Sequence, residues 1–359
     1  MSTKPISKSI SREPLDSKVD KKVFVGLSGG VDSAVSAALL KQEGYDVTGV
    51  FIKTWSPDFL PCTWREERRD AMRVAVRLGI PFLFFDFEEE YKKGVADYMI
   101  EEYWQGRTPN PDVMCNRVVK FGAFWQKAQE LGADYIATGH YARTDGEKLY
   151  EGKDASKDQS YFLWMLTQAD LEHTLFPVGE LKKSEVRELA QKFDIPVSDK
   201  KDSQGICFLG DVNMQDFLSH YIDIVPGDVL DESGEVIGRH NGALLYTLGE
   251  RHGFEIHIKS PDSKPFYVIG KNVDTNTITV SSDPETISKS SPQEVRIEKK
   301  NGIRPFSDRC EARIRYRQER FGVEIAGDTV RFSEPQAAAS GQSIVFYQGD
   351  ECLGGAIIS

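Results

Sequence analysis

The sequence GLSGGVDS at residues 26–33 follows a short apolar run and precedes a segment rich in Ala and Leu. This order predicts a buried strand, a Gly-rich turn and the start of a helix. Small side chains let a phosphate group approach the backbone of such a turn, where N–H groups and the helix dipole attract an anion. Because no Gly-Lys-Ser/Thr ends the segment, it is not a Walker loop. The alternative interpretation is an ordinary Gly-rich connection between strand and helix.

Strand and helix patterns alternate through the first half of the chain. Strands are predicted at residues 23–27, 47–52, 81–86 and 135–138, and helices from the loop to about residue 43 and at 66–78, 88–105 and 121–131. Strands separated by helices predict a parallel sheet covered on both faces. Ligands bind at the carboxyl ends of such strands, where residues 26–33, 51–55 and 138–141 would lie.

After about residue 210, frequent turn signals replace the helix periodicity. This change predicts two small, mostly β domains, the last of them a β-barrel. Residues 281–291, with several Ser and a Pro, are predicted to be a linker. The predicted domains are a disordered tail at 1–22, an α/β catalytic domain at 23–210, a central β-rich domain at 211–285 and a C-terminal β-barrel at 292–359.

The composition is typical of a globular protein, with 40% hydrophobic and 28% charged residues among 359. The apolar stretches are too short to span a bilayer, and the polar first 22 residues fit neither a signal peptide nor a mitochondrial presequence, so we expect no membrane and a cytoplasmic location. The net charge of −11 does not exclude a nucleic-acid partner, because local patches decide such binding. Five cysteines without a Cys-x-x-Cys pair argue against structural disulfides and zinc or cluster sites.

Two cysteines stand in polar motifs. The prolines Pro109 and Pro111 predict a stiff turn at the start of NPDVMC, residues 110–115. Within it, Asp112 and Cys115 are three residues apart and would share one face of a helical turn. A carboxylate beside a thiol can exchange protons with reacting groups, although its charge does not favour the thiolate. In KDSQGICF at residues 201–208, a Gly-containing polar loop can expose the thiol of Cys207. The alternative for each is a packed structural cysteine, and only the fold could bring the two together.

Three other segments suit contacts with nucleotides. Gly139 permits close approach of a base or ribose, and His140 could contact phosphate, although a lone His is more often an ordinary core or surface residue. Residues 153–161 mix a cation, amides and an aromatic, which suits RNA contacts or a solvated loop. The alternation RIRYR at 313–317 predicts a strand with its three Arg on one face. Residues 291–320 hold nine Lys/Arg and five Asp/Glu, which indicates an RNA-backbone footprint or a solvated face.

Taken together, these motifs resemble those of the tRNA-specific 2-thiouridylases (the MnmA/TrmU family), a branch of the PP-loop ATP pyrophosphatases. The resemblance runs from residue 23 to residue 359, and its motifs lie at 26–33, 106–112, 115–116, 137–143, 157–162, 201–208, 246–253, 315–318 and 352–355. It implies a PP-loop ATP-binding catalytic domain with a parallel sheet, followed by two small mostly β domains, of which the C-terminal β-barrel binds tRNA. It also implies an enzyme, a sulfurtransferase that thiolates the wobble uridine of tRNA.

The resemblance also implies roles for individual residues. ATP, accompanied by Mg²⁺, would be bound by Gly26, Leu27, Ser28, Gly29, Gly30, Val31, Asp32, Ser33, Ile52 and Gly139. The family usually has Met in place of Ile52, and both are apolar enough to pack on adenine. The target base would be held by Asn110, Pro111 and Asp112, and the anticodon region of tRNA by His140, Lys157, Asp158, Gln159, Arg315, Tyr316 and Gln342. No residue is implied as a ligand of a protein-bound metal.

In the implied reaction, transfer of AMP to the C2 oxygen of uracil makes the ring carbon electrophilic. Cys207 would carry persulfide sulfur delivered by a sulfur-relay donor protein. Cys115 would be the nucleophile that ends in a transient Cys115–Cys207 disulfide, and Asp112 would be the general acid/base. The target uridine must flip out of its stack for this chemistry.

Two other functions are open at the level of sequence. One is another PP-loop enzyme, an adenylating ligase or amidotransferase, which would need neither paired thiols nor a basic β module. The other is a non-catalytic tRNA-binding protein that keeps a relict nucleotide site. The missing Cys-x-x-Cys disfavours a cluster-dependent thiolase, although a cluster held by Cys115 and Cys207 stays open.

Overall fold

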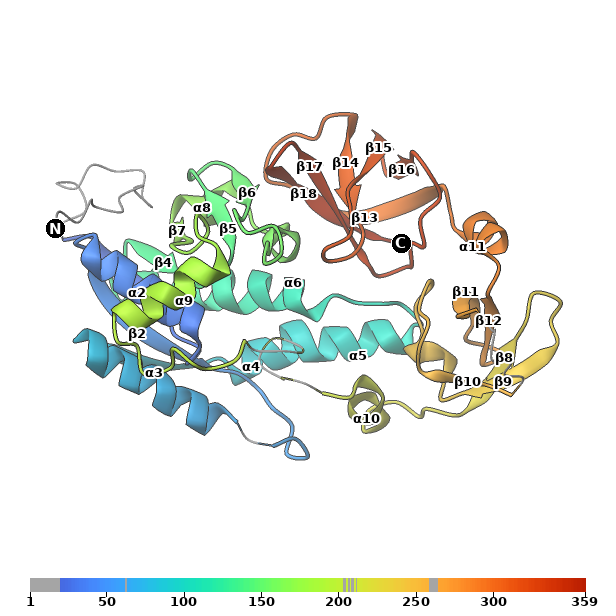
Figure 1. Ribbon diagram of the computed structural model, residues 1–359, viewed down its shortest axis with the longest axis horizontal. Helices are drawn as coiled ribbons and strands as arrows, with labels where there is room; N and C mark the ends of the chain where they lie inside the picture. Colours follow the sequence, from blue (N-terminus) through green and yellow to red (C-terminus); the bar gives the residue numbers. More distant parts are fainter. Residues whose placement is uncertain are drawn as a thin grey trace. The chain divides into compact units, whose positions relative to one another are not determined.

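The computed structural model describes residues 20–61, 63–202, 205, 207, 210, 212–257 and 264–359 (Figure 1). Of the predicted tail at 1–22, the structure describes only the last three residues. Cys62 and several positions of the 201–208 motif also lie outside the described residues. The chain forms two compact units. The first holds the described residues up to 92, with 113–204 and 349–353, and the second holds 93–112, 205–348 and 354–359.

A parallel sheet forms the centre of the first unit. Its strand order is β3-β2-β1-β4-β7, and every neighbouring pair is parallel. The strands are β1 (Lys22–Gly26), β2 (Asp46–Lys53), β3 (Phe82–Asp86), β4 (Tyr135–Ala137) and β7 (Thr174–Leu175). Val23, Val25 and Val50 are fully buried, because a parallel sheet covered on both faces hides both sides of its central strands. The α/β fold predicted for this part of the chain is confirmed.

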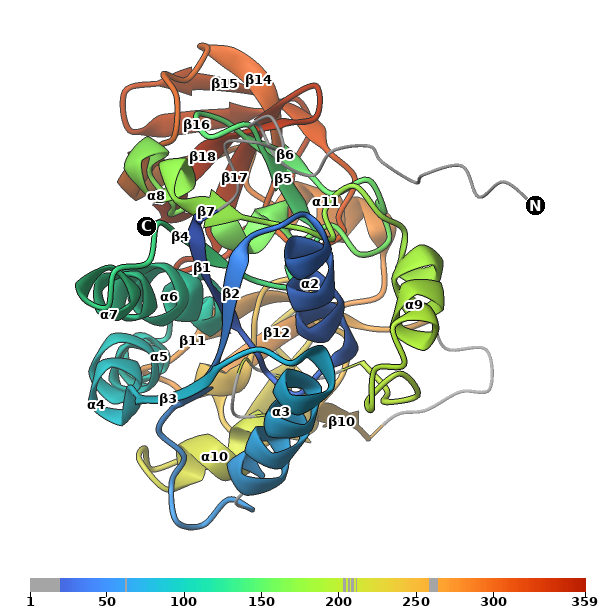
Figure 2. The ribbon, with the colours of Figure 1, turned by 90° about the vertical axis from the view of Figure 1, so that its left-hand side faces the viewer.

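Helices lie on both sides of this sheet. The helices α2 (Val31–Gln42), α3 (Trp64–Leu78) and α9 (Lys183–Lys192) lie on one side, and α4 (Glu88–Tyr91) and α7 (Phe124–Glu130) lie on the other (Figure 2). The helix α3 ends at Gly79, whose φ of +59° is the left-handed conformation that Gly adopts readily at helix ends. Apolar side chains of β1, α2, α3 and α9 make one core cluster. This core holds the loop between β1 and α2 at the carboxyl edge of the sheet.

The helix predicted at 121–131 begins ten residues earlier than expected. It runs as α6 (Pro111–Cys115), a π-helical segment η2 (Asn116–Ala123) and α7. Proline is tolerated in the first turn of a helix, where its missing N–H has no partner to lose, so Pro111 starts the helix where a turn was predicted. The helix predicted at 88–105 likewise contains a π-helical segment, η1 (Lys92–Ala96), between α4 and α5 (Asp97–Trp104). As a result, Asp112 and Cys115 both belong to α6.

Two β structures follow in the second unit. The first is a five-stranded sheet in the order β10-β9-β8-β12-β11, with β8 and β12 parallel and the other pairs antiparallel. Its core contains Val229, Tyr246 and Val280. The strands are β8 (Gly227–Leu230), β9 (Val236–His240), β10 (Phe254–Ile256), β11 (Tyr267–Asn272) and β12 (Thr277–Ser281).

The second β structure is a barrel of six antiparallel strands, which confirms the predicted β-barrel. The order β13-β16-β15-β14-β17-β18 is closed by pairing of β13 with β18. The strands are β13 (Glu294–Gly302), β14 (Arg309–Arg313), β15 (Phe321–Ala326), β16 (Thr329–Phe332), β17 (Ser343–Gln348) and β18 (Glu351–Ile358). The first residues of β18, Glu351 and Cys352, belong to the first unit and pair there with β6 (Leu149–Glu151), which forms a hairpin with β5 (Ala142–Thr144). The short helical elements are η3 (Ser160–Leu163), α8 (Gln168–Glu172), α10 (Met214–Ser219) and η4 (Ala243–Leu245).

Two local features of the β region differ from a simple reading of the sequence. The 281–291 segment, predicted as a linker, contains a helix, α11 (Pro284–Ser290), which begins because Asp283 accepts a hydrogen bond from the N–H of Thr286 and Pro occupies the first turn. The RIRYR alternation does not form a strand over its length, because β14 ends at Arg313. The side chain of Gln318 accepts hydrogen bonds from the N–H groups of Ile314 and Arg315, which turns the chain there. The three Arg side chains therefore do not line one strand face.

No helix of the described residues has the length and apolar character needed to cross a membrane.

An ion pair in the second unit gives a prediction about stability. Nε of Arg107 lies 2.8 Å from Oε2 of Glu102, whose side chain is 9% exposed, and Nη2 lies 2.5 Å from Oε1 of Glu298. Replacing Arg107 with Gln leaves the carboxylate of Glu102 buried without its cation, which we expect to lower the free energy of unfolding by about 3 kcal/mol. Urea titration measures this change.

The matched control is Arg309→Gln, which removes an exposed ion pair between Arg309 in β14 and Glu324 in β15. We expect this variant to lose about 1 kcal/mol or less, because exposed pairs are screened by solvent. If both variants lose the same free energy of unfolding, Arg107 stabilises the fold no more than an exposed ion pair does.

Candidate active site

The loop between β1 and α2 is held by its own backbone and hydroxyl groups. The N–H of Leu27 donates to the carbonyl of Val50 in β2 at 2.7 Å, and the N–H of Ser28 donates to the hydroxyl of Ser33 at 3.3 Å. In the part of the chain that the structure describes, no side chain caps the start of α2 at Gly30. The first N–H groups of an uncapped helix bind an anion readily, and the helix dipole adds to the attraction.

Two glycines are needed for the close packing of this loop. Gly29 has a φ of +73°, and a Cβ atom there would lie 2.6 Å from the carbonyl oxygen of Glu67. A Cβ atom on Gly139 would lie 2.7 Å from the backbone nitrogen of Ser33. Gly139 follows β4, so the carboxyl ends of β1 and β4 meet at the loop, as expected for neighbouring parallel strands. Ile52 is buried in β2, the strand on the other side of β1.

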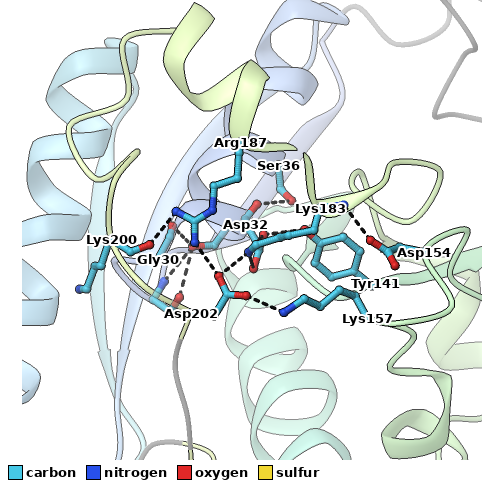
Figure 3. A network of polar contacts seen from close by, with 12 residues as sticks. Gly30, Asp32, Ser36, Tyr141, Asp154, Lys157, Lys183, Arg187, Lys200 and Asp202 are labelled. Carbon is cyan, nitrogen blue, oxygen red and sulfur yellow. Dashed lines mark hydrogen bonds and ion pairs between the residues drawn. The ribbon is translucent and has the colours of Figure 1, made fainter. Parts of the chain in front are cut away.

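Asp32, in the first turn of α2, is the centre of a polar network beside the loop (Figure 3). Its carboxylate accepts hydrogen bonds from Nζ of Lys183 at 2.7 and 2.9 Å and from the hydroxyl of Tyr141 at 2.8 Å. Burial and the neighbouring Asp32 carboxylate raise the pKa of Tyr141 far above its usual value. The phenol therefore stays protonated and donates to Asp32 at every physiological pH.

Asp202 lies in the same network and faces three cations. Its carboxylate lies 2.7 Å from Nζ of Lys157, 2.8 Å from Nζ of Lys183 and 2.8 Å from Nη2 of Arg187. Burial acts to raise the pKa of Asp202, but hydrogen bonds from Lys157 and Lys183 more than offset it and bring the pKa to about 2. Sequence reasoning missed Lys183 and Arg187. Their i, i+4 spacing on α9 was the available signal, but it does not reveal partners far away along the chain.

Lys200 joins the network to the loop itself. Its Nζ donates to the backbone carbonyl of Gly29 at 3.1 Å and to Oδ2 of Asp70 in α3 at 2.9 Å. This contact ties the 200–202 segment to the glycine turn.

His140 and Asp158, predicted as tRNA contacts, are buried in this conformation. The His140 ring packs against Phe121 and Phe176 and shares a hydrogen bond with Thr138, while burial, aided by Lys120, lowers its pKa well below the usual value. The carboxylate of Asp158 accepts hydrogen bonds from the N–H of Gly152 and from Ser160.

Gln159, the third of these predicted contacts, is held by the backbone. Its side-chain oxygen accepts a hydrogen bond from the backbone N–H of Tyr141, and its own backbone N–H donates to the carbonyl of Tyr141. In this conformation His140, Asp158 and Gln159 hold the 138–162 region together.

Asp112 and Cys115 belong to α6, and of residues 205–207 the structure describes Gly205 and Cys207. Cys115, at the end of α6, is fully buried, whereas Cys207 is partly exposed. Oδ1 of Asp112 accepts a hydrogen bond from the backbone N–H of Cys207 at 2.8 Å. Asn110 directly precedes Pro111, where α6 begins. Among the described residues, no group of three or more His, Cys, Asp or Glu side chains is placed to hold a metal ion.

Two other described cysteines do not have the character of reactive thiols. Burial, with help from Glu311, raises the pKa of Cys310 to about 12, so its thiolate is scarce at neutral pH. Cys352 is fully buried in β18.

The predicted tRNA contacts of the barrel lie in its loops. Arg315 donates to the backbone carbonyls of Leu248 and Ala337, and Gln342 accepts from the N–H of Ala339. The guanidinium of Arg317 lies 4.9 Å from the ring centre of Tyr316. Arg315 therefore joins the barrel to the β structure before it within the second unit.

A phosphate-type loop without a Walker lysine, at the carboxyl edge of a parallel sheet and joined to a β domain and a barrel, defines a PP-loop nucleotide-binding protein with two β modules. Three family models match in series: a tRNA methyl transferase HUP domain at residues 21–211, a tRNA methyl transferase PRC-barrel domain at 215–282 and an aminomethyltransferase beta-barrel domain at 293–358. The chain belongs to the family of tRNA-specific 2-thiouridylases, because relatives with that name match its sequence over nearly their whole length.

Three of these relatives show how far the match extends. The tRNA-specific 2-thiouridylase MnmA of Listeria monocytogenes is 45% identical, and the match covers 94% of this chain and 95% of the relative. The tRNA-specific 2-thiouridylase MnmA 2 of Geobacillus kaustophilus is 44% identical, and the tRNA-specific 2-thiouridylase MnmA of Bacillus cytotoxicus is 45% identical, both with the same coverage. The resemblance inferred from the motifs is confirmed.

Proposed function

We propose that this protein catalyses ATP-dependent 2-thiolation of the wobble uridine of tRNA. The observation that carries the proposal, beside family membership, is the hydrogen bond from the N–H of Cys207 to Asp112. It joins two motifs that are far apart in the sequence, and Asp112 is one helical turn from Cys115 in α6. An adenylating enzyme that does not handle sulfur has no need for one cysteine a helical turn along from this carboxylate and a second cysteine whose backbone N–H binds it.

ATP fits the loop at residues 26–33. The uncapped start of α2 suits a phosphate, and the tight packing at Gly29 and Gly139 keeps the backbone within reach of one. Bound there with Mg²⁺, ATP would transfer AMP to the C2 oxygen of the target uracil and release pyrophosphate. The adenylated C2 oxygen leaves as part of AMP, which is a far better leaving group than an unmodified carbonyl oxygen.

Sulfur transfer requires both cysteines. Cys207 would carry a persulfide, received from a sulfur-relay donor protein, and its S–S bond breaks as the sulfane sulfur leaves. Cys115 forms a new disulfide with Cys207. In forming it the two cysteine sulfurs lose two electrons in total, and these electrons reduce the sulfane sulfur. That sulfur bonds to C2, AMP departs with the former oxygen, and an external thiol reduces the disulfide. Asp112 would move the protons.

Cys115 is fully buried, so the reaction requires opening around α6. The π-helical segment that follows Cys115 supports such a change, because π-helical insertions are frequent at functional sites.

The target base would be held by Asn110, Pro111 and Asp112 at the start of α6. Contacts with the anticodon region of tRNA are proposed for Lys157, Arg315, Tyr316 and Gln342, with His140, Asp158 and Gln159 shaping the backbone beside Lys157. We place the reaction in the cytoplasm.

Mass spectrometry tests the proposal directly. Unmodified tRNA is incubated with the protein, ATP, Mg²⁺ and a persulfide source, then digested to nucleosides. We expect 2-thiouridine at the wobble position, dependent on ATP and accompanied by AMP and pyrophosphate. Adenylation of a small molecule without sulfur in tRNA would instead identify a ligase or amidotransferase, and tRNA binding without ATP cleavage would identify a non-catalytic protein.

A further inference from the structure

The cations around Asp202 outnumber the carboxylate that they share. Lys157, Lys183 and Arg187 all lie within 2.8 Å of its oxygens. Lys183 also binds Asp32, so three cations face two carboxylates, and this surplus of positive charge suits an anion with more charge and more oxygens, such as the phosphate chain of a nucleotide.

The position of this cluster also suits nucleotide phosphate. Nζ of Lys183 bonds both Asp202 and Asp32, and Asp32 lies within the PP-loop. Figure 3 shows Lys183 and Arg187 reaching from α9 to the start of α2, where Gly30 begins the helix. Lys183 therefore stands beside the N–H groups that would bind a phosphate.

We propose that Lys183 is a phosphate ligand of ATP, with Arg187 adding positive charge, and that Asp202 occupies these two cations as an internal substitute until the nucleotide binds. The proposal rests on the proposed function in one respect, that the loop at 26–33 binds ATP. In the cluster that the structure describes, a carboxylate takes the place that phosphate oxygens would take, and ATP must displace it.

A purely structural role makes the opposite prediction for Asp202. If the cluster only ties the 200–202 segment to α9, removing the charge of Asp202 loosens the cluster and leaves ATP affinity unchanged or lower. If Asp202 competes with phosphate, removing its charge makes ATP bind more tightly. Because the pKa of Asp202 is about 2, the competing anion is fully ionised at neutral pH.

The test is equilibrium binding of ATP to the full chain without tRNA or sulfur donor, so that no reaction interferes. Inorganic pyrophosphate and adenosine are titrated in parallel. Lys183→Met should weaken binding of ATP and pyrophosphate by at least about tenfold, the loss expected for a hydrogen bond to a charged group. Asp202→Asn, which keeps the shape of the side chain, should tighten both about threefold or more. Adenosine affinity should stay the same in all variants.

Lys192→Met is the matched control, since this exposed lysine lies at the other end of the same helix. It should bind ATP as the unchanged chain does. Thermal unfolding of each variant separates loss of binding from loss of fold.

The outcomes separate this inference from the proposed function. If the unchanged chain does not bind ATP, the proposed function fails. If it binds ATP but Lys183→Met binds equally well, or Asp202→Asn gains no affinity, the inference about Lys183 and Asp202 is wrong while the proposed function stands.

Discussion

Replacement of Cys115 with Ser is expected to abolish formation of 2-thiouridine, with a loss of more than about 100-fold in rate, because a hydroxyl cannot form the disulfide that we propose releases sulfur from Cys207. ATP affinity should remain within about twofold, since Cys115 has no role in the PP-loop. Nucleoside mass spectrometry measures the first quantity and equilibrium ATP binding the second. Cys207→Ser should give the same pattern.

The control for this experiment is Cys352→Ser. Cys352 is also fully buried, so the substitution places a hydroxyl in a similar apolar setting and reproduces any effect of burial alone. This variant should keep its thiolation activity. Thiouridine formed at a near-normal rate by Cys115→Ser, or lost equally in the Cys352 control, would remove the assigned role of Cys115.

Replacement of Gly139 with Ala is expected to impair ATP binding strongly. The added Cβ would lie 2.7 Å from the nitrogen of Ser33 and 2.9 Å from the carbonyl carbon of Asp32, both of them backbone atoms that cannot turn aside. The start of α2 must then shift. Overpacking of this kind costs roughly 1–3 kcal/mol, so ATP affinity should fall about 10- to 100-fold.

Gly322→Ala in β15 provides the comparison. Its added Cβ would meet only the side chain of Ser333, at an ordinary contact distance of 3.6 Å. ATP affinity should not change in this variant. If Gly139→Ala binds ATP as tightly as the Gly322 variant does, the close packing of β4 against the PP-loop is not needed for nucleotide binding.

The parallel sheet and the loop at 26–33 could be predicted from the sequence because their signals are local. Apolar strands, an amphipathic α3 and Gly79 as a helix end lie within short windows, and the loop residues are contiguous. The position of Gly139 beside the loop followed from the rule that parallel strands share one carboxyl edge.

The errors came from interactions that no short pattern reveals. The alternation at 313–317 matched a strand, but the side chain of Gln318 captured two backbone N–H groups and ended β14 at Arg313. Pro111 was interpreted as part of a turn, although a proline also starts a helix. Lys183 could not be assigned to the site because its partner Asp32 is 151 residues away.

The division of β18 has a consequence for how the polypeptide matures on the ribosome. The first unit takes residues 349–353 from the far end of the chain, where Asp350 pairs with Arg143, Glu351 pairs with Lys148, and Glu351 and Cys352 line up with β6. Synthesis proceeds from the N-terminus, so the first unit lacks this strand until the ribosome has passed residue 353. A nascent chain stalled before residue 349 would leave the β5–β6 hairpin with an open edge.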